Sequence, residues 1–317
     1  MAFSDNASRL DEAARAGWLY FIAGNTQEEI AQKLRVSRAT AQRLVSLSIS
    51  ERLITFRAEH RITACMELEV RLVDRFGLRF CRVAPSDPAA PGAVFGAAEA
   101  AADLLETTLR NPIPQVVAIG TGRMMRAMVE HIAPMDRPDH QIVSLVGNIS
   151  PDGSASFFDA LARLADLTKA RHFPMPLPTF LSSREEREQL LRIHAVERIR
   201  ALAERADLRL VGVGQMDLNA QLHVDGFISR DELFAMQRLG AVGEVTGWAY
   251  DRGGKILEGG SNERVTSIPV QVESANLVVG VASGPAKVDA IGAALGGKIL
   301  NGLITNETTA QALLDLR

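Results

Sequence analysis

Two adjacent stretches near the start of the chain carry apolar residues at helical spacing, which predicts two short helices joined by a turn at Arg35–Val36. The apolar positions are Ile30, Ala31, Leu34, Ala41, Leu44 and Val45. Thr26 and Glu29 have the spacing of a capping box, and Ser37 is a second N-cap candidate. Residues 26–56 are therefore interpreted as a helix-turn-helix, a unit that places its second helix in the DNA major groove.

The polar positions of the second helix point away from this apolar face. Arginine and glutamine on an exposed helix can hydrogen-bond guanine and adenine edges with two bonds each, and hydroxyls at a helix start suit phosphate contacts. The alternative is an ordinary helical hairpin in a globular core. The DNA-binding candidates are Lys33, Ser37, Arg38, Thr40, Gln42 and Arg43.

Local charge favours the DNA-binding interpretation. Residues 33–57 hold six basic residues and one acid, a net charge of +5. Because the whole chain has a net charge of −3, the remainder is at −8. A basic island in an acidic protein is what phosphate attraction needs. The partner predicted for this region is double-stranded operator DNA.

A first helix is predicted from Leu10, Ala14, Trp18 and Ile22, which step at helical spacing and are expected to pack beneath the two helices above. Residues 54–56 are a short strand candidate, a small wing. Residues 1–58 are thus predicted to form an all-α helix-turn-helix domain.

Residues 61–76 have the pattern of a connecting helix, with Ile62, Met66, Val70 and Val73 near one face. Two interpretations stay open. The segment 59–76 is either a helix packed on the next domain or a linker that dimerises.

From residue 77 onward, short apolar runs alternate with helical segments, which predicts crossover units and a mainly parallel sheet covered on both faces. The expected strands are 79–84, 116–119, 142–146, 208–213, 242–249, 277–282 and 298–304. The expected helices are 97–110, 124–132, 157–169, 184–205, 231–238, 288–295 and 307–314. Residues 174–178 are proline-rich and expected to be a loop. Residues 77–317 are therefore predicted to be one doubly wound, Rossmann-like α/β domain.

Composition agrees with two globular domains: 317 residues are 47% hydrophobic and 23% charged. Aromatic residues make up 5%, which argues against stacking on single strands as the main activity. Cys65 and Cys81 match no metal or redox spacing, so no disulfide framework or metal site is expected. No signal peptide or membrane span is apparent, and a cytoplasmic protein is expected.

Two strand ends in the second domain have the chemistry of an anion site. Gly120–Thr121–Gly122–Arg123 follows the strand at 116–119 and precedes a helix, so backbone N–H groups and a guanidinium meet there. Ser283–Gly284–Pro285 ends another strand, and Lys287 begins the next helix. Each has a plainer interpretation. The first could be a purely structural turn, and Lys287 could be a solvated lysine. Two such ends in one domain favour a phosphate-type pocket.

Several longer segments resemble the SorC family of bacterial sugar-responsive transcriptional regulators. They include TQEEIAQKLRVSRATAQRL, AIGTGRMM, LVGVGQMD, GAVGEVTGWAYDRGGKIL and ASGPAKVDAIGAALGGKILNGLITNETTAQALL. The resemblance extends over nearly the full length of the chain. Asn306 and Trp248–Ala249–Tyr250 depart from the family pattern, which usually has Asp and two adjacent Phe there.

The resemblance implies an effector domain related to sugar-phosphate isomerases and deaminases, which binds a sugar phosphate or polyol, in a dimer or tetramer. It implies a phosphate loop at 120–123, a phosphate-contacting Lys287 and a Glu244 that accepts hydrogen bonds from sugar hydroxyls. Residues after other strand ends, Asn148 and Gln215, are further candidates. The expected effector-binding residues are Gly120, Thr121, Gly122, Arg123, Asn148, Gln215, Glu244 and Lys287.

The function expected is a ligand-controlled regulator of a carbohydrate or polyol operon, a repressor, with no cofactor. The alternative is an isomerase or deaminase with a DNA-binding arm, which needs a base beside the substrate carbonyl. Of the histidines, His223 has an acid two residues away, Asp225, and is the candidate for such a base.

Overall fold

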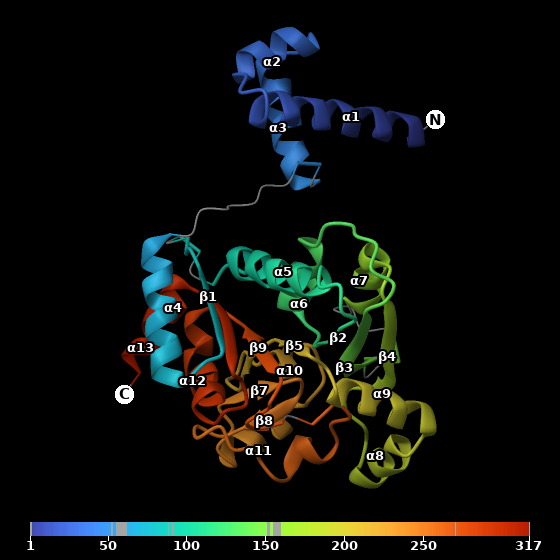
Figure 1. Cartoon of the computed structure of the whole chain (residues 1–317), viewed down its shortest axis with the longest axis vertical. Coiled ribbons are helices and arrows are strands. Elements are labelled where there is room, and N and C mark those ends of the chain that lie inside the picture. Colours follow the sequence, from blue (N-terminus) through green and yellow to red (C-terminus); the bar gives the residue numbers. More distant parts are fainter. Residues whose placement is uncertain are drawn as a thin grey trace. The chain divides into compact units, whose positions relative to one another are not determined.

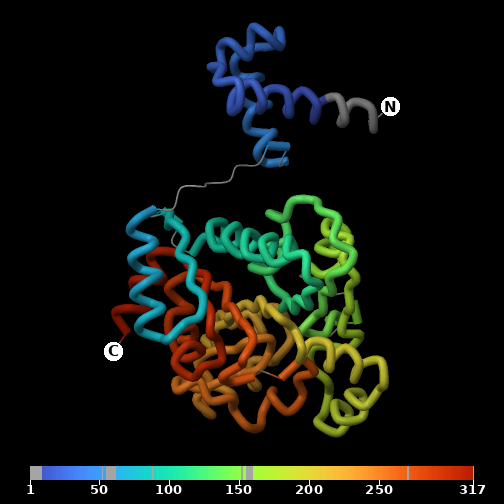
Figure 2. The backbone as a smooth tube through the Cα atoms, in the orientation of Figure 1, coloured from blue at the N-terminus to red at the C-terminus, as the bar shows by residue number. Residues whose placement is uncertain are grey.

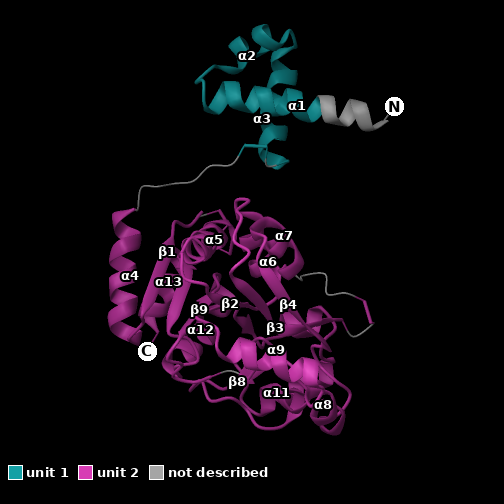
Figure 3. Cartoon of the chain, turned by 45° about the vertical axis from the view of Figure 1, so that its right-hand side comes forward, with its two compact units in different colours: residues 1–61 teal, residues 62–317 magenta. Residues whose placement is uncertain are grey.

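The chain forms two compact units, residues 1–61 and residues 62–317 (Figure 3). In this computed structural model the described residues are 2–51, 53–54, 62–87, 89–90, 92–150, 153–154, 160–269 and 271–316, with residues 2–8 by their backbone alone. Residues of uncertain placement are grey in Figure 2, and all of them except the backbone of residues 2–8 lie outside this description. Two of the three residues expected to form the wing strand, Thr55 and Phe56, are among the residues left out.

Unit 1 contains three helices, α1 (Ala2–Phe21), α2 (Gln27–Leu34) and α3 (Arg38–Ser50). The expected apolar faces of α2 and α3 are confirmed, with Ile30, Ala31, Ala41, Leu44 and Val45 buried and Leu34 packed against them.

The expected buried face of α1 was wrong. Trp18 and Ile22 are exposed, and the helix is buried through Ala13, Ala16 and Gly17 instead. A Cβ atom added to Gly17 would lie 2.3 Å from Ser48 Oγ, so this turn of α1 lies almost against α3. Small residues therefore mark the contact, because a large side chain would separate the two helices.

Unit 2 is built on a seven-stranded sheet in the order β1-β10-β9-β5-β2-β3-β4, and all its pairings are parallel. Its strands are β1 (Phe80–Ala84), β2 (Val116–Ile119), β3 (Gln141–Ile149), β4 (Arg171–Pro178), β5 (Leu208–Val211), β9 (Leu277–Val281) and β10 (Gly302–Asn306). The expectation of a mainly parallel sheet is confirmed.

Helices cover both faces of this sheet. The helices of unit 2 are α4 (Thr63–Phe76), α5 (Phe95–Leu109), α6 (Arg123–Glu130), α7 (Leu161–Thr168), α8 (Arg184–Leu191), α9 (His194–Glu204), α10 (Gln221–Val224), α11 (Arg230–Arg238), α12 (Val288–Gly296) and α13 (Glu307–Asp315). Helices α5, α6 and α7 lie together on one side of the sheet (Figure 1). Helices α4, α9, α12 and α13 cover the other, so the fold is doubly wound.

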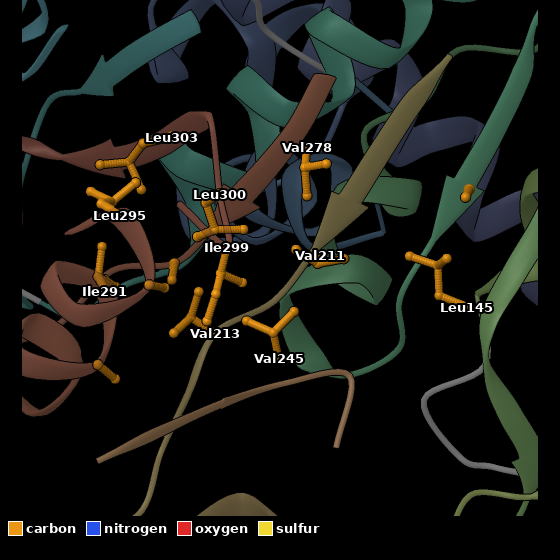
Figure 4. Close-up of a cluster of buried hydrophobic side chains, with 14 of the residues drawn as sticks. Leu145, Val211, Val213, Val245, Val278, Ile291, Leu295, Ile299, Leu300 and Leu303 are labelled. Atoms are coloured by element: carbon orange, nitrogen blue, oxygen red, sulfur yellow. The ribbon is translucent and has the colours of Figure 1, made fainter. Parts of the chain in front are cut away.

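Successive side chains of each strand point to opposite faces of the sheet, so the buried residues form one cluster on each face. Val117 and Ile119 of β2 pack towards α5 and α6, whereas Ala118 packs into the opposite cluster. Figure 4 shows part of that second cluster, in which Leu303 of β10 lies near Leu295 of α12, and Leu300 and Ile299 lie between α12 and Val211 and Val278 of the strands. Burial on both faces explains why the strands are nearly continuous apolar runs.

A smaller antiparallel sheet follows β5 and is formed by β6 (Gly214–Gln215), β7 (Gly243–Val245) and β8 (Trp248–Tyr250). The single strand expected over residues 242–249 was therefore wrong. Thr246 and Gly247 have φ values of 52° and 89° and form a two-residue hairpin turn between β7 and β8.

Two further expectations were wrong. Residues 174–178 are not a loop but belong to β4, the edge strand beside β3, with which Phe173, Met175 and Pro178 are in register. Pro174 and Pro176 have no register partner on β3 and are tolerated because an edge strand needs N–H donors on one side alone. The single helix expected over residues 184–205 is divided at Arg192–Ile193 into α8 and α9.

Helix α4 packs against β1 and α13 and so belongs to unit 2. It is buried through Cys65, Glu69 and Leu72, and the Glu69 carboxylate accepts a hydrogen bond from Val83 N at 3.0 Å. The face expected from the sequence, with Ile62, Met66 and Val70, is exposed.

Candidate functional site

The helix-turn-helix of unit 1 has the local geometry that its sequence predicts. Thr26 caps α2 with a full capping box, in which Thr26 N donates to Glu29 at 2.7 Å. Arg35 ends α2 in the left-handed region with φ of 56°. Ser37 caps α3 by accepting a hydrogen bond from Thr40 N at 3.1 Å. These local contacts fix both ends of the turn and hence the direction in which α3 leaves it.

The side chains predicted to contact DNA lie on the open surface of this unit. Lys33, Ser37, Arg38, Gln42 and Arg43 are exposed and Thr40 is half-buried. Their binding to DNA stays a prediction.

A cavity of about 280 Å³ lies at the carboxyl ends of the parallel strands in unit 2. From β2 the chain proceeds outward to β3 and β4, whereas from β5 it proceeds in the opposite direction to β9 and β10. The boundary between β2 and β5 is therefore the topological switch point, where open α/β sheets bind their ligands. The loops that follow β2, β5 and β9 all contribute to the cavity.

Six of the eight predicted effector residues line this cavity: Thr121, Gly122, Arg123, Gln215, Glu244 and Lys287. Gly120 is buried at the end of β2, where its N–H donates to Leu210 O at 2.8 Å, and does not line the cavity. Asn148 lies on β3, also outside the lining. The structure thus brings together residues as distant in sequence as Thr121 and Lys287. Their contact with an effector stays a prediction.

Glu244 is held by backbone on two sides. Gly247 N, in the hairpin turn, donates to its carboxylate at 2.7 Å. On the other side lies Gly214, paired with Glu244 across β6 and β7, where an added Cβ atom would be 2.1 Å from Glu244 Oε1. The carboxylate therefore occupies space that any other residue at position 214 would fill.

Glu244 and Lys287 act on each other electrostatically within the cavity. Burial raises the pKa of Glu244, and the Gly247 N–H and the charge of Lys287 partly oppose that rise. Burial lowers the pKa of Lys287, against the attraction of Glu244. The Lys287 ammonium also donates to Val213 O at 2.8 Å, which anchors it at the strand end after β5.

Arg123 begins α6, and its guanidinium holds the carboxylate of Asp225 in a bidentate pair. The two N–H···O distances are 3.0 Å and 2.8 Å. This hydrogen-bonded carboxylate raises the pKa of Arg123. Asp225 follows the short helix α10 and lines the same cavity. Arg123 thus already holds an anionic group supplied by the chain itself.

The histidine–acid pair required by the enzyme alternative does not form. His223 Nδ1 lies 3.2 Å from Ile228 O, whereas the Asp225 carboxylate is engaged by Arg123. The cavity lining contains no histidine. Within the parts of the chain that the structure describes, no group of three His, Cys, Asp or Glu residues could hold a metal ion.

Sequence reasoning missed several lining residues. Asp225 was considered only as a partner of His223, and Ser283 only as part of a strand end. Gln221 and Thr179 were not considered. The signal for Ser283 was present, because it follows β9 directly before Gly284. Gln221 and Asp225 gave no such signal, since Gln221 begins the four-residue helix α10 and Asp225 follows it, away from the strand ends of the main sheet.

The family model described as "Putative sugar-binding domain" matches residues 60–315. The erythritol catabolism regulatory protein EryD of Brucella abortus is 34% identical over 302 residues, which span 95% of this chain and 96% of the relative. The chain belongs to the SorC family of sugar-binding transcriptional regulators.

Other family members agree with this assignment. The transcriptional regulator LsrR of Klebsiella pneumoniae is 32% identical over 311 residues, which span 96% of this chain and 92% of the relative. The full-length sorbitol operon regulator SorC of Klebsiella pneumoniae has a similar fold, with a TM-score of 0.71, 23% identity and coverage of 96% and 99% of the two chains. These SorC-family relatives are named as regulators and not as enzymes, which agrees with the expectation for this chain.

Proposed function

We propose that this chain is a repressor of a carbohydrate or polyol catabolic operon, and that a sugar, sugar phosphate or polyol in the cavity switches its affinity for operator DNA. The observation that carries the proposal is the combination, in one chain, of a capped helix-turn-helix with an exposed basic second helix and an α/β unit whose switch-point cavity is lined by charged side chains. EryD, a regulator of erythritol catabolism, supports the operon class.

In this proposal residues 1–58 bind DNA, residues 59–76 connect, and residues 77–317 bind the effector and form the oligomer. A single helix-turn-helix contacts few base pairs, so a dimer or tetramer would bind an inverted repeat with two second helices about one DNA turn apart. Because chromosomal DNA is its partner, we place its action in the cytoplasm. No helix among the described residues is long and apolar enough to cross a membrane.

Switching requires a modest coupling free energy between the two ligands. A coupling of about 1–3 kcal/mol changes operator affinity roughly 5- to 150-fold. The effector would bind near Thr121, Arg123, Glu244 and Lys287, which line the cavity. The DNA would be bound mainly by Gln42 and Arg43, which are exposed on α3.

The test is fluorescence anisotropy with DNA from the chain's own promoter region, at moderate salt, with and without candidate effectors. Arg43→Ala should weaken operator binding by about 1–3 kcal/mol and relax base preference at one position, without changing effector binding. Lys287→Ala should bind the operator normally but lose the response to effector.

Each variant controls for the other, because their side chains belong to different units. Lys33→Ala adds a contrast within unit 1, since loss of a phosphate contact reduces the salt dependence of binding without relaxing base preference. Absence of sequence-preferring binding by the unaltered chain under every condition would rule out the proposed function.

A further inference from the structure

Four charged side chains line the cavity of unit 2, two of them positive and two negative. Arg123 and Lys287 are cationic, and Asp225 and Glu244 are anionic. The lining therefore has no excess positive charge. Sites that bind a phosphate dianion offer it such an excess or a set of uncommitted donors.

The donors of Arg123 that would bind a phosphate are already committed to Asp225. The two N–H···O bonds of this pair join both terminal nitrogens of Arg123 to the two carboxylate oxygens, at 3.0 Å and 2.8 Å. Such a fork binds one planar or tetrahedral anionic group at a time through that edge. A phosphate there would have to displace the Asp225 carboxylate and then remain beside its negative charge.

Lys287 is committed in a similar way. Its ammonium donates a hydrogen bond to Val213 O at 2.8 Å and is attracted electrostatically by the Glu244 carboxylate. An incoming dianion near Lys287 would be repelled by the Glu244 carboxylate, which the backbone of Gly247 holds in place. Neither cation of the lining is therefore open to an anion without a second negative charge close by.

Two uncharged side chains of the lining, Gln215 and Gln221, have acceptor atoms that lack a hydrogen-bond donor among the described residues. The side-chain amide oxygens of Gln215 and Gln221 are buried and have no hydrogen-bond partner within the described part of the chain. Both residues line the cavity, and Gln215 is 9% exposed. A buried acceptor without a partner is costly. Ligand hydroxyls can donate to it, whereas the oxygens of a phosphate dianion only accept.

We propose, on the basis of the function above, that the effector is an uncharged polyhydroxyl compound and that Asp225 is the specificity residue that excludes phosphorylated ones. Arg123 and Asp225 together form a neutral part of the wall, and Glu244, Gln215 and Gln221 accept hydrogen bonds from ligand hydroxyls. Specificity of this kind rests on a repulsive element as much as on attraction.

The experiment is isothermal titration calorimetry on the full chain with matched probes: erythritol, ribitol, xylitol and D-mannitol, and the monophosphate of each. The unaltered chain should bind at least one alditol, and bind it more tightly than its monophosphate. Asp225→Asn removes one negative charge and keeps the side-chain shape. It should shift the ratio of the two dissociation constants about tenfold towards the phosphate, a value that allows for the partial exposure of the pair.

Glu188→Gln is the matched control. It removes a carboxylate from another arginine–acid pair of unit 2, Arg184–Glu188 at 3.0 Å, which does not line the cavity. It should leave the ratio unchanged. Thermal melting of both variants establishes that they are folded.

Tighter binding of a monophosphate than of its parent alditol by the unaltered chain would overturn the inference, and this comparison needs no variant. An unchanged ratio in folded Asp225→Asn would overturn the role of Asp225. Binding of none of the probes, together with promoter binding that no probe alters, would count against the proposed function itself.

Discussion

At the scale of single residues, Gly214 decides where the Glu244 carboxylate can lie. Gly214→Ala would place a Cβ atom 2.1 Å from Glu244 Oε1, between two paired strands that cannot easily separate. The carboxylate must then move, so effector affinity should fall by about tenfold or more, as expected when a buried hydrogen-bonding group is misplaced. Operator binding without effector should be unchanged.

Calorimetry with the effector and anisotropy with promoter DNA measure these two results. Gly296→Ala is the control, because a Cβ atom added there meets nothing within 4 Å. Full effector affinity in Gly214→Ala would show that Glu244 does not contact the ligand.

Some cavity residues could be predicted from the sequence and others could not. Thr121 to Arg123 lie within four residues of the end of β2, and Lys287 lies within six residues of the end of β9. Each segment contains glycine, so a local pattern identified these residues. Asp225 pairs with Arg123 across 102 positions of the chain, from the residue that follows a four-residue helix. No local pattern encodes such a contact, and the neutral charge of the lining was accordingly not foreseen.

At the scale of elements, signals at helix ends predicted structure better than apolar spacing did. The caps at Thr26 and Ser37 are confirmed because each is a hydrogen bond between residues three apart. The buried face of α1 was misjudged because large apolar residues were given more weight than Ala13, Ala16 and Gly17. Close helix contacts favour small residues, which a hydrophobic pattern alone does not reveal.

A substitution at Gly17 tests the close contact between α1 and α3. Gly17→Ala should destabilise unit 1 by about 1–3 kcal/mol, since a methyl group there overpacks the contact with Ser48. Thermal unfolding followed by circular dichroism should show the loss, and operator binding should weaken with it. Effector binding in unit 2 should not change. Adding Ser48→Gly should restore part of the stability, and an unaltered melting curve for Gly17→Ala would mean that the two helices can move apart at no cost.

At the scale of the whole molecule, the alternation of strands and helices predicted the parallel sheet but not its order. The order β1-β10-β9-β5-β2-β3-β4 places the two predicted loops, after β2 and after β9, on either side of β5. The loop after β5 completes the wall between them with Gly214 and Gln215. Strand neighbours are set by long-range packing, which one sequence does not display. The rule that ligands lie at the switch point nevertheless selected two loops that both line one cavity in the structure.

The division into two units predicts that effector binding survives without unit 1. Residues 62–317 contain both faces of the sheet, their covering helices and every cavity residue, and no core cluster of this unit includes a residue of unit 1. A fragment of these residues should therefore bind the effector within about twofold of the full chain's affinity, because independent sites contribute additively. It should not bind promoter DNA. Calorimetry and anisotropy on the two proteins measure this. Loss of effector binding in a folded fragment would show that residues 1–61 complete the site, and would require the two activities to be assigned to the chain as a whole.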